Sequence, residues 1–316
     1  MRFGYHASHE QLPPSELLRC VQRASAQGFT HAMCSDHFAP WTEEGQCGHA
    51  WTWLGAALAS TQCTLGVVTA PGQRYHPAIH AQAMATLAEM FEGRFWAALG
   101  SGELLNEHVV DPTWPGKDER RARLLECVQV IRALFAGETV SHRGRILVDR
   151  AKLYTRPRTP PPLLGAAASE DSAAWVAGWA DGLITVNAPR ERLRAILDAY
   201  RSHGGEGKPA YLQVHLSIGE TEQRALEVAH REWAHGALGG PLAWEVATPE
   251  AFDVATKHVR PEDVRDSVRI ATSLERQIEW LQQDLEMGFD RVYLHLVGPD
   301  QEPLLAGAPH LREVLR

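Results

Sequence analysis

The sequence predicts an α/β protein of the (β/α)8 TIM-barrel class, and three observations lead to this prediction. Short apolar segments alternate with helical segments along the chain, a pattern typical of repeated βα units around a parallel sheet. Eight such apolar segments occur in 316 residues, a length that suits one barrel. The first predicted strand-to-helix turn, residues 6–14, lacks the glycines with which an open, doubly wound sheet binds a dinucleotide. We therefore expect one barrel domain over residues 1–316 rather than an open sheet.

The predicted strands and helices follow one another in chain order. The strands cover Phe3–His6, His31–Ser35, Thr64–Thr69, Phe95–Gly100, Leu163–Ala167, Gly182–Val186, Leu212–Ser217 and Arg291–Val297. The helices cover Ser15–Gln27, Trp51–Ser60, Ala78–Phe91, Glu119–Phe135, Asp171–Ala180, Arg190–His203, Thr221–His235 and Leu274–Met287. Gly28 and Gly288 directly follow helical segments, where glycine commonly ends a helix. Two insertions interrupt the alternation: residues 138–161, a predicted hairpin and proline-rich linker, and residues 236–272.

Composition and charge exclude several classes of protein. The net charge of −8 argues against binding to a nucleic-acid backbone. No apolar run is long enough to span a membrane, and the N-terminal residues lack the apolar core of a signal peptide. The five cysteines form no CxxC pair, so neither a disulfide framework nor a zinc knuckle is predicted. We expect a cytoplasmic protein that acts on a small-molecule substrate, without a nucleic-acid or membrane partner.

Two polar clusters follow the second and fourth predicted strands, at the end of the barrel where active sites of this class lie. The first contains Asp36, His37 and Trp41; a carboxylate beside an imidazole suits proton transfer, although a surface loop with a salt-linked histidine has the same composition. The second runs from Gly100 and Ser101 to Glu103 and Asn106. Its glycines allow the backbone to approach a flat ring, and Glu103 is a candidate general acid. A plain strand-to-helix turn is the alternative.

Two further features leave alternatives open. Ala168 and Ser169 precede the helix after the fifth strand, where free N–H groups can bind a cofactor phosphate, but a simple helix cap is favoured. Asp36, His37, His215 and His295 could converge on a metal ion, as in a metal-dependent barrel hydrolase. His6 and His9 do not support that arrangement, because their spacing directs them to opposite faces of an extended chain.

Five motifs resemble those of the bacterial luciferase-like superfamily, and within it the branch of the F420-dependent glucose-6-phosphate dehydrogenases. The resemblance covers Phe3 to about Val297, with the motifs in the same order. They are SDHFxPW (residues 35–41), RYHPA followed by AQA (74–83), LGSGE followed by NE (99–107), ADGLIT (180–185) and GFDxVYLH (288–295). The resemblance implies a (β/α)8 barrel of the luciferase-like type that binds FMN or coenzyme F420, a deazaflavin, at the mouth of the barrel. It also implies a homodimer.

The resemblance implies roles for the matching residues. His37 corresponds to the histidine near the reactive carbon of the cofactor ring, Glu103 to the carboxylate that transfers a proton, and Trp41 to the tryptophan of the same loop. Cofactor contacts are implied for Asp36, Gly100, Ser101, Asn106, Ala168 and Ser169. Val67 and Val68 fall where the family has a strand bulge, often with a non-prolyl cis peptide behind the ring. A hydride transfer to or from a small organic substrate is implied, with flavin-dependent monooxygenation and a non-catalytic flavin-binding barrel as alternatives.

The chain departs from the sugar-phosphate dehydrogenases at two places. Pro189 stands about where those enzymes have a lysine that grips the substrate phosphate, which puts glucose 6-phosphate in doubt. Glu170 follows Ala168 and Ser169 at the expected phosphate turn. An added carboxylate there would disfavour the long anionic tail of F420, so the sequence leans slightly towards FMN.

Overall fold

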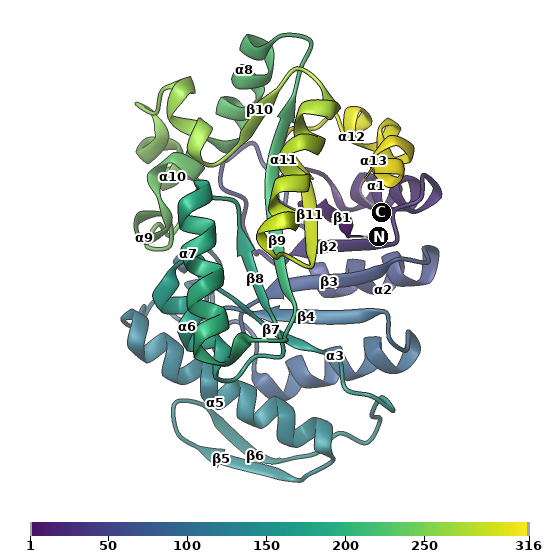
Figure 1. The fold of residues 1–316 in the computed structure, drawn as a ribbon. Helices are drawn as coiled ribbons and strands as arrows, with labels where there is room; N and C mark the ends of the chain where they lie inside the picture. The colour runs from purple at the N-terminus through teal and green to yellow at the C-terminus, as the bar shows by residue number, and fades with distance from the viewer. Residues whose placement is uncertain (1, 315–316) are drawn as a thin grey trace.

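The computed structural model describes residues 2–314, in which eight parallel strands form a closed barrel (Figure 1). Around the barrel the strands are β1 (Phe3–Ala7), β2 (His31–Ser35), β3 (Thr64–Thr69), β4 (Phe95–Leu99), β7 (Leu163–Ala166), β8 (Leu183–Val186), β9 (Ala210–Ile218) and β11 (Arg291–Leu296). The barrel closes because β9 pairs with both β8 and β11, and β11 pairs with β1. Each predicted strand is present, and the predicted fold class is confirmed.

Helices pack around the outside of the barrel, as Figure 1 shows. The long ones are α1 (Pro14–Ala26), α2 (Ala50–Ser60), α3 (Pro77–Met90), α5 (Lys117–Ala136), α6 (Glu170–Ala177), α7 (Arg190–Tyr200), α8 (Glu222–Trp233) and α11 (Leu274–Met287). Gly28 and Gly288 have φ angles of 104° and 116°, a left-handed conformation that suits glycine and ends α1 and α11 as predicted.

The structure contains several short elements that the sequence does not predict. The last barrel strand is followed by two short helices, α12 (Glu302–Ala306) and α13 (Ala308–Val314). The second insertion contains α9 (Gly240–Ala243), α10 (Pro249–Thr256) and a three-residue strand, β10 (Arg269–Ala271), which pairs with the end of β9. A further short helix, α4 (Leu104–Glu107), follows β4. The first insertion contains the expected antiparallel hairpin, β5 (Val140–Arg143) and β6 (Leu147–Ala151).

The interior of the barrel is filled by aromatic side chains. Trp96 contacts both Tyr211 and Tyr293, with ring centroids 5.5 and 5.6 Å apart. Gly66 makes room for this packing, because a Cβ atom at that position would lie 1.9 Å from the Trp96 indole. The barrel is therefore a packed core, and the space for a ligand lies at its carboxyl-terminal mouth.

Candidate active site

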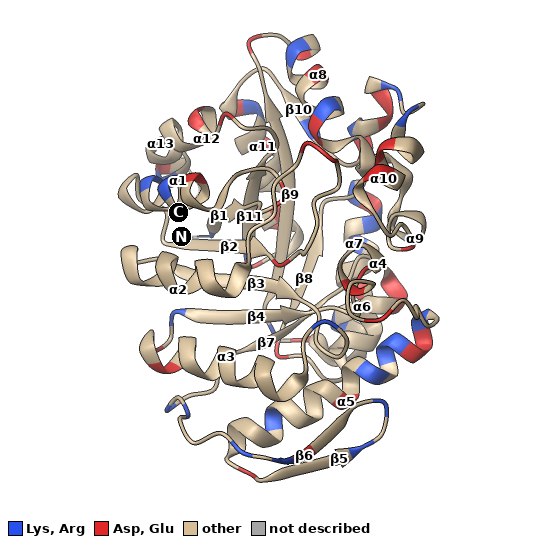
Figure 2. Ribbon diagram, turned by 180° about the vertical axis from the view of Figure 1, so that it is seen from behind, with Lys and Arg blue, Asp and Glu red and all other residues tan. Residues whose placement is uncertain are grey.

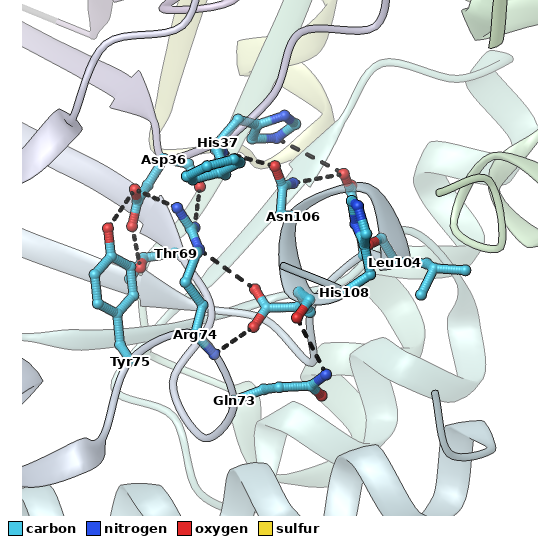
Figure 3. Close-up of polar contacts among 12 residues, drawn as sticks. Asp36, His37, Thr69, Gln73, Arg74, Tyr75, Leu104, Asn106 and His108 are labelled. Carbon is cyan, nitrogen blue, oxygen red and sulfur yellow. Dashed lines mark hydrogen bonds and ion pairs between the residues drawn. The ribbon is translucent and has the colours of Figure 1, made fainter. Parts of the chain in front are cut away.

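A cavity of about 640 Å³ opens at the carboxyl ends of the barrel strands. Nine of the eleven predicted site residues line it: Asp36, His37, Trp41, Val68, Gly100, Ser101, Glu103, Asn106 and Ala168. These residues come from β3 and from the loops after β2, β4 and β7, and the pairing of these neighbouring strands brings together segments that are far apart in the sequence. Figure 3 shows the polar contacts on one side of this cavity.

Asp36 is a buried carboxylate that accepts hydrogen bonds from four side chains, and Figure 3 shows those from Thr69, Arg74 and Tyr75. Its Oδ2 accepts hydrogen bonds from Thr69 Oγ1 at 2.6 Å and from Trp51 Nε1 at 3.1 Å. Its Oδ1 accepts from Tyr75 at 3.1 Å and from Arg74 at 3.4 Å. So many donors fix the orientation of the carboxylate, and burial raises the pKa of Tyr75, which keeps that hydroxyl protonated as a donor.

Arg74 links the Asp36 loop to the loop after β4. Its Nη2 donates to the Asp36 carbonyl at 2.7 Å, and its backbone N–H donates to Glu107 Oε2 at 2.7 Å. The guanidinium also lies 3.7 Å from Glu107 Oε1. Burial raises the pKa of Glu107, although Arg74 opposes the shift. The arrangement joins the two polar clusters predicted from the sequence into one structure.

His37 lies between two carboxylates of different exposure. Its Nδ1 is 3.5 Å from Glu10 Oε1, and its Nε2 is 3.7 Å from Glu103 Oε2. The Glu10 side chain is 1% exposed, whereas that of Glu103 is 32% exposed and faces the cavity. Nε2 of the imidazole therefore lies on the cavity side, whereas Nδ1 faces a buried carboxylate.

Glu10 is anionic in spite of its burial. Burial acts to raise the pKa of its carboxyl, but His37 and hydrogen bonds from the hydroxyls of Ser35 and Ser8, both at 2.7 Å, outweigh it and lower the pKa. Glu10 therefore places a negative charge 3.5 Å from Nδ1 of His37.

Trp41 contacts His37 edge-on, with ring centroids 4.8 Å apart. Its other contacts come from the end of α8 and the short helical turn that follows it: Trp41 stacks on His235 at 4.4 Å and packs against Trp233 at 4.9 Å. The loop after β2 is thus packed against the carboxyl end of α8. These rings form one wall of the cavity.

The loop after β4 leaves room for a flat ring. Asn106 accepts a hydrogen bond from the Phe38 backbone N–H at 2.8 Å, which ties this loop to the loop after β2. At Gly100, an added Cβ atom would lie no closer than 3.8 Å to the surrounding atoms, so the backbone borders open space in the cavity. A backbone without a Cβ atom at this position can be approached closely by a flat group.

Two predicted residues, Val67 and Ser169, do not line the cavity. Val67 is fully buried between the barrel and its helices, whereas Val68 lies on the opposite face of β3, at the interior of the barrel. The expected bulge is absent in this strand, which pairs in unbroken register with β2 and β4, and every peptide bond among residues 2–314 is trans. Ser169 instead caps α6 by accepting a hydrogen bond from the Ser172 N–H, the alternative favoured above.

The metal alternative receives no support from the arrangement of these side chains. Asp36 is saturated by donors, and His215 contacts the Ser267 carbonyl and Gln213. His295 lies next to Gln11, with Nε2 2.6 Å from its side-chain oxygen. Within residues 2–314, no group of three or more His, Cys, Asp or Glu side chains is placed to hold a metal ion.

Sequence reasoning did not assign a role to Glu10, Arg74 or Tyr75. Arg74 and Tyr75 follow β3, so their place at the carboxyl end of a barrel strand was the available signal. Glu10 follows β1 and carries the same signal, but Ser8, His9 and Gln11 lie in the same turn and are equally plausible candidates. The pairing of β1 with β2 brings Glu10 to His37.

The family model for luciferase-like monooxygenases matches residues 1–298. An F420-dependent glucose-6-phosphate dehydrogenase from Nakamurella multipartita is 34% identical, over 97% of this chain and 94% of its own length. A solved structure of an F420-dependent secondary alcohol dehydrogenase in complex with an F420-acetone adduct superposes with a TM-score of 0.89 at 29% identity, over 99% of this chain and 97% of that one. A tetrahydromethanopterin reductase from Methanopyrus kandleri, at 19% identity and a TM-score of 0.76 over 99% of this chain and 98% of that one, shows the fold alone.

The chain belongs to the luciferase-like family of oxidoreductases. The resemblance drawn from its motifs is therefore confirmed, and the alternative of a barrel hydrolase is set aside. The lean towards FMN is not supported, because these curated relatives are named for coenzyme F420. Among residues 2–314, no helix combines the length and the apolar character that crossing a bilayer requires.

Proposed function

We propose that this protein is an F420-dependent dehydrogenase that oxidises an alcohol, or reduces the corresponding carbonyl compound, at His37. The observation that carries the proposal is the position of His37 between buried Glu10 and cavity-facing Glu103. The curated relatives and the secondary alcohol dehydrogenase, all named for F420, support the choice of cofactor.

The cavity fits a deazaflavin with an anionic tail. Open space at Gly100 can accept the ring, and Asp36 and Asn106 lie beside it. Four cationic side chains line the cavity from the α5 and α7 side: Lys117, Arg120, Arg121 and Arg192. The Arg120 Nε atom is buried and has no hydrogen-bond partner within the described chain. An anionic group of the cofactor would supply that partner.

The position of Glu170 removes the reason for the lean towards FMN. Glu170 is exposed on α6 and does not line the cavity, so its charge is screened by water. The neighbouring Asp171 forms ion pairs with Lys117 at 2.8 Å and Arg121 at 2.7 Å. The cations outnumber the carboxylates at this side of the cavity, which favours a ligand with several negative charges.

Bound F420 supplies a ring carbon that accepts or donates a hydride. The residues of this chain manage the accompanying protons. During alcohol oxidation, His37 accepts the hydroxyl proton at Nε2, and Glu10 stabilises the imidazolium that results. Glu103, on the cavity side of the same nitrogen, exchanges that proton with the cavity. Trp41 holds the His37 ring in place and excludes water from one side of it.

Variants of the two proton-transfer residues test the proposal. We expect His37→Ala and Glu103→Gln to lower kcat for F420 reduction by about 100- to 10,000-fold and to change the F420 dissociation constant by less than about threefold. His310→Ala is the matched control, because His310 is exposed on α13 and does not line the cavity. Full activity in both site variants, or failure of the wild-type protein to bind F420, would disprove the proposal.

We further infer a homodimer that forms through α2 and α3. No charged residue occurs in α2, and Glu89 is the one charged residue of α3. In Figure 2 the ribbons of both helices are almost entirely tan, the colour of uncharged residues. The exposed positions of this face include Ala56, Ala59 and Ile79. Sedimentation equilibrium should give twice the chain mass, and Ile79→Glu should give monomers; a wild-type monomer would contradict the inference.

A further inference from the structure

The cavity continues beyond His37 into a second region, which we call the outer subsite. It is formed by Trp41, Trp233 and His235, with Asn187, His215 and Ser267 behind them, and all six residues line the cavity. Trp41 stacks on His235 with ring planes at 17°, and Trp233 packs against both, at 4.9 and 4.4 Å. The same Trp41 contacts His37. The outer subsite therefore lies one indole ring away from the proposed reaction centre.

His235 is the unsatisfied polar group of this subsite. Its side chain is buried, with 7% of the residue exposed, yet neither Nδ1 nor Nε2 has a hydrogen-bond partner within the described chain. Its ring neighbours, Trp41, Trp233 and Phe252, pack against it through their faces and edges. A buried imidazole without partners is costly, and a ligand oxygen in the cavity would remove that cost.

The outer subsite carries no positive charge at neutral pH. Burial lowers the pKa of His235 to about 3 and that of His215 to about 4, so both rings are neutral. Arg269 is the cation that acts on His215, but it does not line the cavity. Both of its terminal nitrogens bind Asp284, at 2.6 and 3.0 Å. Asp263 and Asp266 also line the cavity. A phosphate group would meet neutral rings and carboxylates there.

The other cations that line the cavity are committed elsewhere. Arg74 binds the carbonyl and carboxylate of Asp36, and Arg192 donates to the Ala168 carbonyl at 3.0 Å. Lys117 and Arg121 share Asp171. Arg120 donates to the Pro115 carbonyl at 2.8 Å and lies 3.5 Å from Glu245 Oε1. These contacts lie with the loops after β3 and β7 and with α5 and α6, the side assigned above to the cofactor. The charge of the cavity is thus divided between a cationic cofactor side and an uncharged outer subsite.

We propose that the outer subsite binds an uncharged substrate with two oxygen functions: an alcohol or carbonyl at His37, and a second hydroxyl or carbonyl oxygen that hydrogen-bonds to His235. His235 is then a specificity-determining residue, and phosphorylated sugars are excluded. The identity of the reacting group rests on the proposed function, whereas the binding preference rests on Trp41, Trp233 and His235 alone. The two indoles supply apolar faces that cover the carbon skeleton between the oxygens.

The test is a binding titration without cofactor, followed through the fluorescence of the protein's tryptophans. Three probes are compared: cyclohexanediol, which has two hydroxyl groups; cyclohexanol, which has one; and glucose 6-phosphate. We expect the diol to bind at least about fivefold more tightly than cyclohexanol, the effect of one neutral hydrogen bond, and glucose 6-phosphate not to quench the fluorescence. Tighter binding of glucose 6-phosphate than of the diol, or equal binding of diol and cyclohexanol, would overturn the proposal.

Two variants assign the preference to His235. His235→Phe keeps an aromatic ring in the stack but removes both nitrogens, and should abolish the difference between diol and cyclohexanol. His235→Gln restores a hydrogen-bonding group and should recover part of the difference. A preference that survives in His235→Phe would contradict the role of this residue. Binding of F420, measured separately on the same proteins, distinguishes failure of this inference from failure of the proposed function.

Discussion

At the scale of single residues, the site depends on two carboxylates that differ in exposure. Glu10 and Glu103 flank the same imidazole, but only Glu103 faces the cavity. A buried anion that receives hydrogen bonds from Ser8 and Ser35 keeps its place and its charge. We therefore assign Glu10 to positioning and charge stabilisation of His37, and proton exchange with the cavity to Glu103.

Glu10→Gln tests this division. The amide keeps the shape of the side chain and can still accept from Ser8 and Ser35, but it removes the charge beside His37. We expect kcat to fall by about a hundredfold while KM for substrate and the dissociation constant of F420 change little. Thermal unfolding of the variant serves as the control for folding. A change confined to KM, with kcat preserved, would contradict the assignment.

At the scale of elements, the packing of β3 against β4 depends on one glycine. A Cβ atom at Gly66 would lie within 2.5 Å of three atoms of the Trp96 indole, inside a barrel with no free space around that ring. We expect Gly66→Ala to lower the free energy of unfolding by about 1–3 kcal/mol, because Trp96 must shift against Tyr211 and Tyr293.

Gly55→Ala is the matched control for this prediction. Gly55 lies within α2, and an added Cβ atom there meets no atom within 4 Å. Alanine is the better helix former, so this variant should be as stable as the wild type or more stable by up to about 1 kcal/mol. Denaturant titrations of both variants check the pair. Equal stability of Gly66→Ala and the wild type would mean that the side chains around Trp96 can move to accommodate an added methyl group, which contradicts the tight packing of Trp96 against Gly66.

The elements that the sequence predicts correctly are those with a strong periodic pattern. Strands such as Thr64–Thr69 are apolar runs between turn residues, and helices such as Leu274–Met287 show one apolar face. The three residues of Arg269–Ala271 form a strand only because the end of β9 is available to pair with them. The two short helices after the last strand, α12 and α13, are also not predicted, because segments of five to seven residues are too short to show a helical period.

The site residues also fall into a group that the sequence predicts and a group that it does not. Residues that directly follow a strand, such as His37 and Glu103, are placed by the barrel rule and line the cavity. Glu10 was missed because its partner lies 27 positions away in sequence, in the loop after the neighbouring strand β2. The family expectation of a bulge at Val67 and Val68 fails here, because β3 pairs regularly with both neighbours.

At the scale of the whole molecule, buried histidines make the fold sensitive to acid. Burial lowers the pKa of His6 and His235 to about 3 and that of His80 and His215 to about 4, below the 6.5 of an exposed histidine. Below pH 6.5 the unfolded chain binds protons at these groups that the folded chain does not. The stability of the fold must therefore fall as the pH drops from 6.5 towards 4.

Denaturant unfolding at several pH values measures this effect. Each of the four histidines should increase the unfolding equilibrium constant about tenfold per pH unit between pH 6 and pH 4.5, which corresponds to an uptake of about four protons on unfolding. Stability that stays constant from pH 7 to pH 5 would show that these histidines are not neutral and buried in the folded protein.

The central claim concerns the cofactor, and direct binding tests it. The purified protein should be titrated with coenzyme F420 and, separately, with FMN, following the fluorescence of each cofactor. Four cations line one side of the cavity, so F420 with its anionic tail should bind at least about tenfold more tightly than FMN, and added salt should weaken its binding. FMN binding as tight as that of F420, or tighter, would contradict the account.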